Sequence, residues 1–212
     1  KFNNIIIINP NVSHTEASIN AQPMEYIVLG ISILSLYSIG GAIFHIVAHA
    51  LLKITLFMSA GAIFVTTGLS EISTMGGLVK KMPVTSVCFT AASIGLAGMP
   101  LMVGFISKFN ILEGAFQQSV PLAIAALLAA ALLALTYLIP VVQVFFGKES
   151  EVANSNHGHG HHEQKGFDAA LPMLLPLTIT IILAIILGFE PNTGAHLYDM
   201  ALMAAEEITG EG

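Results

Sequence analysis

The amino-acid sequence predicts an all-α membrane protein, a polytopic bundle of about six transmembrane helices, one of them broken. Hydrophobic residues make up 55% of the 212-residue chain and charged residues only 9%, whereas soluble domains carry roughly a quarter charged residues. The apolar residues fall into runs close to the roughly 20 residues that a helix needs to cross a bilayer. In one run, small residues and a proline gather at mid-length, which predicts an interrupted helix.

The first two spans are predicted at residues 24–40 and 42–68. Residues 1–23 precede them as an extramembrane segment, because a short isoleucine run there is followed by proline and polar residues. We expect Gly40-Gly41 to form the turn between the two spans, which would make them an antiparallel pair. The polar stretch 70–82 is the next loop, and Pro83 suits the first turn of the helix that follows it.

Residues 83–116 are too few for two straight spans and too many for one. We therefore predict a short third helix followed by a fourth that is broken, with the interruption between Gly98 and Ser107. Broken helices at membrane depth occur only where they are buried in protein or line a wet cavity. A fifth span follows at 121–146, kinked at Pro140.

The remaining chain divides by polarity. Residues 24–146 are expected to form one five-helix membrane repeat, followed by a polar loop at 147–168, a last transmembrane helix at 169–190 and an acidic tail at 191–212. The hydropathy of the last helix places it at Leu171–Phe189. Within the tail, residues 195–208 predict a short interfacial helix, with one face formed by Leu197, Met200, Ala201 and Ala204.

Composition excludes several classes of function. The chain has no arginine and no basic patch, so nucleic acid is not expected as a partner. Cys88 is the single cysteine, which removes disulfides and cysteine metal sites. The loops on the two sides of the membrane carry equal numbers of lysines, Lys80 and Lys81 on one side and Lys148 and Lys165 on the other. The positive-inside rule therefore does not predict the orientation of the chain in the membrane.

The second span carries a polar stripe formed by His45, His49 and Lys53. Their four-residue spacing places all three on one helical face. Insertion of a lysine in mid-membrane costs about 2.5–3.5 kcal/mol, and such residues are mostly functional. A structural role, with Lys53 hydrogen-bonded to a neighbouring helix, is the simpler alternative. Histidines one and two turns away nevertheless form a chain of titratable groups that could relay protons.

A second lysine, Lys108, follows the predicted break directly. Unwound backbone at membrane depth offers carbonyls to a cation or to water, and an adjacent lysine can change between charged and neutral states. Glu113 is a weaker candidate, because an ordinary interfacial carboxylate explains it equally well. In the 147–168 loop, the histidine tract lies among glycines and predicts a solvated segment rather than a metal site; its members are His157, His159, His161 and His162.

Three segments together resemble the antiporter-like subunits of respiratory complex I, membrane-bound hydrogenases and multi-subunit Na⁺/H⁺ antiporters. They are HIVAHALLKITLFMSAG at 45–61, MGGLVKKMP at 75–83 and GMPLMVGFISK at 98–108. The resemblance covers about residues 22–190. It implies that Lys53 and Lys108 are relay lysines of a proton half-channel, with His45 and His49 between them and water.

Such subunits have about fourteen helices in two inverted repeats, and this chain resembles only the second repeat with one further helix. We therefore expect a split or partial chain, with another membrane subunit supplying the missing first repeat. The chain starts at Lys1 rather than methionine. The implied function is transport of H⁺, or exchange of H⁺ for Na⁺, within a larger complex in the cell membrane.

Two alternatives stay open at this point. The chain could be a structural membrane anchor with no transport role, or a quinone-site subunit of an oxidoreductase. The sequence contains no cysteine cluster and no glycine-rich dinucleotide fingerprint. We therefore expect no cofactor and no metal in this chain, and no catalytic site of its own. Any electron transfer would belong to other subunits.

Overall fold

The computed structural model describes residues 25–68, 76–135, 138–139, 141, 147, 168–193 and 196–210, and every regular element in these ranges is helical. A short helix at 25–32 comes first. The labelled elements that follow are α2 (Leu36–Thr67), the 3₁₀ turn η3 (Leu78–Lys80), α3 (Pro83–Ala97), α4 (Val103–Gln117), α5 (Pro121–Ala134), α8 (Leu171–Phe189) and α9 (Leu197–Thr209).

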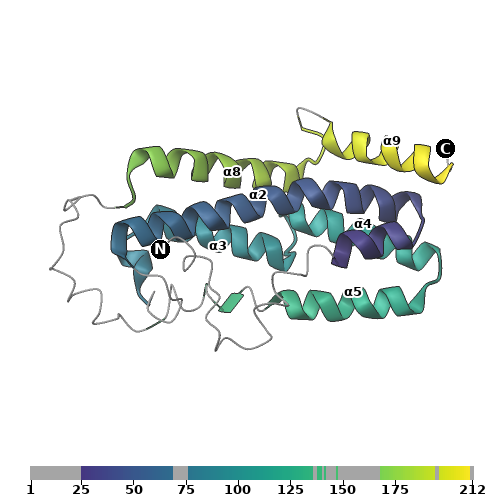
Figure 1. Ribbon diagram of the computed structural model, residues 1–212, viewed down its shortest axis with the longest axis horizontal. Coiled ribbons are helices and arrows are strands. Elements are labelled where there is room, and N and C mark those ends of the chain that lie inside the picture. The colour runs from purple at the N-terminus through teal and green to yellow at the C-terminus, as the bar shows by residue number, and fades with distance from the viewer. Residues whose placement is uncertain are drawn as a thin grey trace.

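The long helix α2 is the central element of the bundle (Figure 1). Its 32 residues give a length of about 48 Å at 1.5 Å per residue. On one side, α3 and α4 follow one another along α2, and on another side α8 and α9 do the same. α5 lies alongside α4.

The predicted turn at Gly40-Gly41 is wrong, because both glycines lie inside α2. The chain turns earlier, at residues 33–35, where Leu34 has a positive φ of 55°. The glycines are needed for close packing instead. A Cβ at Gly41 would lie 2.9 Å from the Cβ of Asn110 in α4, and one at Gly40 would lie 2.7 Å from Leu202 in α9.

The predicted interruption between Gly98 and Ser107 is confirmed. α3 ends at Ala97 and is capped by Gly98, whose φ is 88°, and α4 begins at Val103. Leu101 in the connection also has a positive φ, 72°, which is uncommon for a residue with a Cβ. A short third helix followed by a separate, broken fourth is not found, because the interruption itself separates α3 from α4. Both helices pack on α2, one after the other along its length (Figure 1). We therefore describe them as the two arms of one broken helix.

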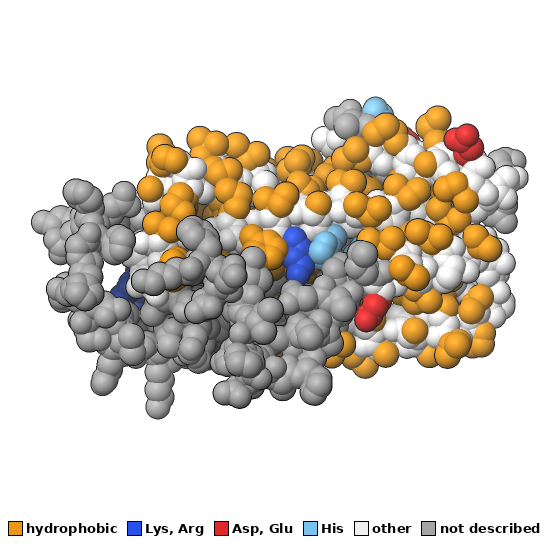
Figure 2. Space-filling view, viewed as in Figure 1, with side chains coloured by type: hydrophobic (Ala, Val, Ile, Leu, Met, Phe, Trp, Pro, Cys, Tyr) orange, Lys and Arg blue, Asp and Glu red, His pale blue; other side chains and the backbone are white. Residues whose placement is uncertain are grey.

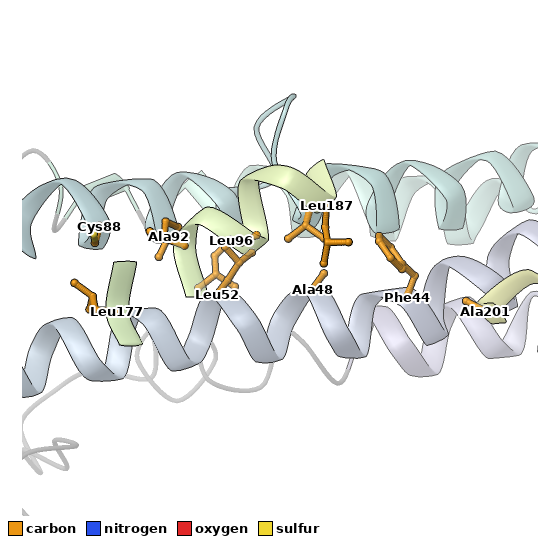
Figure 3. Packing of buried hydrophobic residues seen from close by; sticks show 12 residues of the cluster. Phe44, Ala48, Leu52, Cys88, Ala92, Leu96, Leu177, Leu187 and Ala201 are labelled. Atoms are coloured by element: carbon orange, nitrogen blue, oxygen red, sulfur yellow. The ribbon is translucent and has the colours of Figure 1, made fainter. Parts of the chain in front are cut away.

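The apolar core lies where α2 meets α3, α8 and α9 (Figure 3). Small and large side chains alternate there, which lets the helices approach closely. From α2 it contains Phe44, Ala48 and Leu52, and from the other helices Cys88, Ala92, Leu96, Val103, Leu177, Ile181, Ala184, Leu187 and Ala201.

Two described helices are long and apolar enough to cross a membrane, α2 and α8, and α3 and α5 are shorter apolar helices. α8 occupies the range that hydropathy predicts for the last span. Many large hydrophobic side chains are exposed, and on the face that Figure 2 shows they cover much of the described surface. Water would penalise such a surface, whereas lipid does not. The predicted kink at Pro140 and the loop histidines lie outside the described residues.

The helix expected in the tail forms as α9, but its packed face differs from the expected one. Ala201 and Ala205 are buried against the bundle, and Leu197 and Tyr198 pack on the core. Met200, expected on this face, is half exposed. The sequence leaves this choice open because apolar residues occur on more than one side of α9.

Candidate functional site

One side of α2 presents His45, His49 and Lys53 at successive turns, as their spacing predicts. His45 is 4% exposed, while His49 and Lys53 are partly buried. The two imidazole rings lie 5.9 Å apart between centroids, tilted by 36°. Lysine and histidine side chains are visible side by side in a mostly hydrophobic surface (Figure 2). The stripe is therefore a continuous row that starts inside the bundle and reaches its surface.

Lys108 lies at the break, in the second turn of α4. Its Nζ donates a hydrogen bond to the carbonyl oxygen of Leu96, 2.7 Å away, in the last turn of α3. The same Nζ lies 5.0 Å from the centroid of the Tyr26 ring. The C-terminal end of a helix carries partial negative charge and the ring face attracts cations. The broken helix thus creates a binding place for the ammonium group.

The two halves of the candidate site meet at Ser107. Its Oγ lies 2.8 Å from Nδ1 of His45, and this hydrogen bond joins α2 to α4. The Tyr26 ring packs against both His45, at 5.5 Å between centroids, and Lys108. Lys53 follows His49 by one turn on the same side of α2. Four of the five predicted residues are thus brought together: Lys53, His49, His45 and Lys108.

Glu113, the weakest candidate, is not part of this group. Five residues separate it from Lys108, so it projects from a different side of α4. Nearby, the Tyr198 hydroxyl donates to Oδ1 of Asn110 at 2.9 Å, which ties α9 to α4.

Sequence reasoning missed Ser107, Tyr26 and the Leu96 carbonyl. Ser107 precedes Lys108 directly, which is a weak signal, and nothing in the sequence marks the other two. It also missed Asp168, whose carboxylate accepts hydrogen bonds from the backbone N–H groups of Val84, at 2.6 Å, and Thr85. This carboxylate caps the N-terminus of α3 from a distant segment. Among the described residues, no cluster of His, Cys, Asp or Glu is arranged to hold a metal.

Residues 18–149 match the sequence profile of the NADH:quinone oxidoreductase/Mrp antiporter transmembrane family. The chain belongs to this family. Members of the family are membrane proteins, so the chain is an integral membrane protein.

Relatives of known type are also similar to the chain in sequence. The chain is 33% identical over 176 residues to a Na(+)/H(+) antiporter subunit of Bacillus subtilis, a match that covers 82% of the chain and 34% of that protein. It is 35% identical over 128 residues to the F(420)H(2) dehydrogenase subunit M of Methanosarcina mazei, covering 60% of the chain and 26% of that protein. The chain spans about a third or less of the length of these relatives.

Solved structures share the fold. The Mrp complex from Dietzia matches 88% of the chain and 41% of its own chain with a TM-score of 0.73 and 21% identity. Respiratory complex I from Thermus thermophilus matches 89% of the chain and 38% of its own, with a TM-score of 0.69 and 21% identity. At these identities the likeness establishes the fold of this family.

Proposed function

We propose that the chain is the proton-translocating part, or the Na⁺/H⁺-exchanging part, of a membrane subunit in a larger respiratory or hydrogenase-type complex. In this proposal, Lys53, His49, His45 and Lys108 relay protons through the bundle. The observation that carries it is the grouping of two lysines and two histidines from α2 and α4 at the break of a membrane helix.

A relay needs groups that can hold a proton at comparable free energy in successive positions. Lys108 has the Leu96 carbonyl and the Tyr26 ring to stabilise its charged form, while its burial favours the neutral form. In this proposal the rings of His45 and His49, 5.9 Å apart between centroids, pass protons between the two lysines. A proton arriving at one lysine raises the electrostatic cost of a proton on the next, so the groups titrate as a coupled set.

The exposed face of α2 around Lys53 is evidence for the proposal that a further subunit or segment packs at this site. Lys53 is only partly buried, and its neighbours Ile54 and Phe57 are half exposed. A lysine in mid-helix cannot face lipid without a large cost. We propose that the missing first repeat covers this face and supplies a carboxylate or lysine at the depth of Lys53.

Photo-crosslinking of the intact complex tests the covered face. A photoreactive residue at Phe57 should crosslink to a protein segment outside residues 24–190. One at Ile182 on α8, 54% exposed against 50% for Phe57, should react mainly with lipid. Lipid adducts alone at Phe57 would contradict a protein neighbour there.

The relay itself is tested by Lys108→Ala. Alanine cannot hold a proton, so coupled ion uptake into vesicles carrying the intact complex should be abolished. Assembly should be mostly unaffected, because removal of a buried cation relieves a desolvation cost. Lys81→Ala is the matched control, since Lys81 is exposed in the loop before α3. Uptake measured with and without Na⁺ separates H⁺ transport from exchange.

Near-normal uptake by the Lys108→Ala complex would mean that the lysine is structural, and the relay would have to be abandoned. Loss of subunit content in parallel with loss of uptake would point to the same conclusion. Loss of uptake with normal content in Lys108→Ala, and normal uptake in Lys81→Ala, is the expected result.

A further inference from the structure

The ring of His45 is held in one orientation. It is 4% exposed, and it packs between the rings of Tyr26 and His49, at 5.5 and 5.9 Å between centroids. Its Nδ1 faces α4, where Ser107 Oγ lies 2.8 Å away. This is the one hydrogen bond that His45 makes to the part of the chain that the structure describes. The two ring nitrogens therefore have different surroundings.

The direction of that hydrogen bond follows from the other partner of Ser107. The carbonyl oxygen of Gly104 lies 3.2 Å from Ser107 Oγ, and a carbonyl can only accept. The hydroxyl has a single proton. If it donates that proton to Gly104, its oxygen accepts from Nδ1–H of His45, and both groups are satisfied. The opposite direction would put the proton on Nε2, for which no described residue provides an acceptor.

We propose that Ser107 is a positioning residue that holds neutral His45 in the tautomer with its proton on Nδ1. The lone pair of Nε2 is then free to take up and release protons. Because Gly104 and Ser107 belong to the first turns of α4, the bond also fixes the ring to the arm of the broken helix that carries Lys108. The effect of this hydrogen bond on transport depends on the relay proposed above. The tautomer of His45 does not depend on it.

The tautomer can be measured by ¹⁵N NMR of the intact complex labelled at histidine, at a pH where the ring is neutral. The His45 signals are those that disappear in His45→Gln. We expect a protonated Nδ1 and an unprotonated Nε2. In Ser107→Ala, the Nδ1 proton loses its acceptor, so the preference for Nδ1–H should be lost and the share of Nε2–H should rise.

The matched transport measurement uses Ser107→Ala and Ser59→Ala. Ser59 is equally buried, but within the described part of the chain its hydroxyl bonds only to the carbonyl of Thr55 in its own helix. Ion uptake per assembled complex should fall about fivefold to tenfold in Ser107→Ala, the factor that one hydrogen bond to a buried group typically contributes. It should stay unchanged in Ser59→Ala, as should the His45 tautomer.

A wild-type His45 protonated on Nε2, or an unchanged tautomer in Ser107→Ala, would overturn the proposal while leaving the relay intact. A changed tautomer with normal uptake would overturn the positioning role in transport. An equal loss of uptake in Ser59→Ala would show a general packing defect and overturn it as well. Failure of the relay is visible separately, as normal uptake in Lys108→Ala.

Discussion

Two sides of α2 differ in the kind of side chain that they bury, one apolar and the other polar. On the side of the core, Phe44, Ala48 and Leu52 need only shape complementarity with α3 and α8. On the other side, His45 and Lys53 carry polar groups that apolar packing cannot satisfy. His45 reaches Ser107 across the helix interface, and Lys53 extends to the exposed edge. The apolar side stabilises the bundle. The polar side costs free energy of burial, which indicates that it is kept for a function.

If this difference between the two sides holds, Lys53→Ala should have the largest effect on transport among substitutions in α2. Alanine removes a proton-binding group and a charge whose insertion costs about 2.5–3.5 kcal/mol, so the fold should be at least as stable. Coupled ion uptake per assembled complex should fall by more than about tenfold, because the loss of one site interrupts a relay. Uptake near the wild-type level would place Lys53 on the structural side of the comparison.

The neighbouring residue should behave in the opposite way. Leu52 is 1% exposed and packs against Gly95 in α3. Leu52→Ala leaves a cavity and should cost about 2–5 kcal/mol of stability, measured as a lower Tm of the purified complex. Ion uptake per assembled complex should change little. Ile182→Ala, on the side of α8 that is expected to face lipid, serves as the control and should change Tm much less, because Ile182 is 54% exposed.

Asp168 makes a polar contact that we expect to affect stability and not transport. Its carboxylate accepts hydrogen bonds from Val84 N and Thr85 N at the start of α3 and bonds the Thr85 hydroxyl, far along α3 from the break. Asp168→Ala should cost about 1 kcal/mol, the usual value of a lost helix N-cap. Tm should fall modestly with normal uptake, and a transport defect at normal stability would show that this cap also acts on the site.

The smallest effect is expected from the histidine tract. Replacement of His157, His159, His161 and His162 together should leave ion uptake and Tm within error of the wild type. The reason lies in the sequence, because a polar, glycine-containing stretch predicts a solvated segment in which histidines have no transport role. The same two assays are sufficient, and a loss of uptake comparable to that of Lys53→Ala would move the tract into the functional group.

The sequence by itself determined which segments are helical and apolar, where the chain breaks at Gly98, and that His45, His49 and Lys53 share one face. These features depend on local spacing and on the backbone preferences of glycine and proline. For the same reason, the extent of α8 could be predicted from hydropathy alone.

Only the tertiary structure decided what these features contact. Gly40 and Gly41 allow helices to approach, whereas the sequence favoured a turn, because the two uses of glycine look identical without the neighbour. The bond between Lys108 and the Leu96 carbonyl and the bond between His45 and Ser107 connect residues that are 12 and 62 positions apart. Such pairs are fixed by how α3 and α4 pack along α2, which no local pattern encodes.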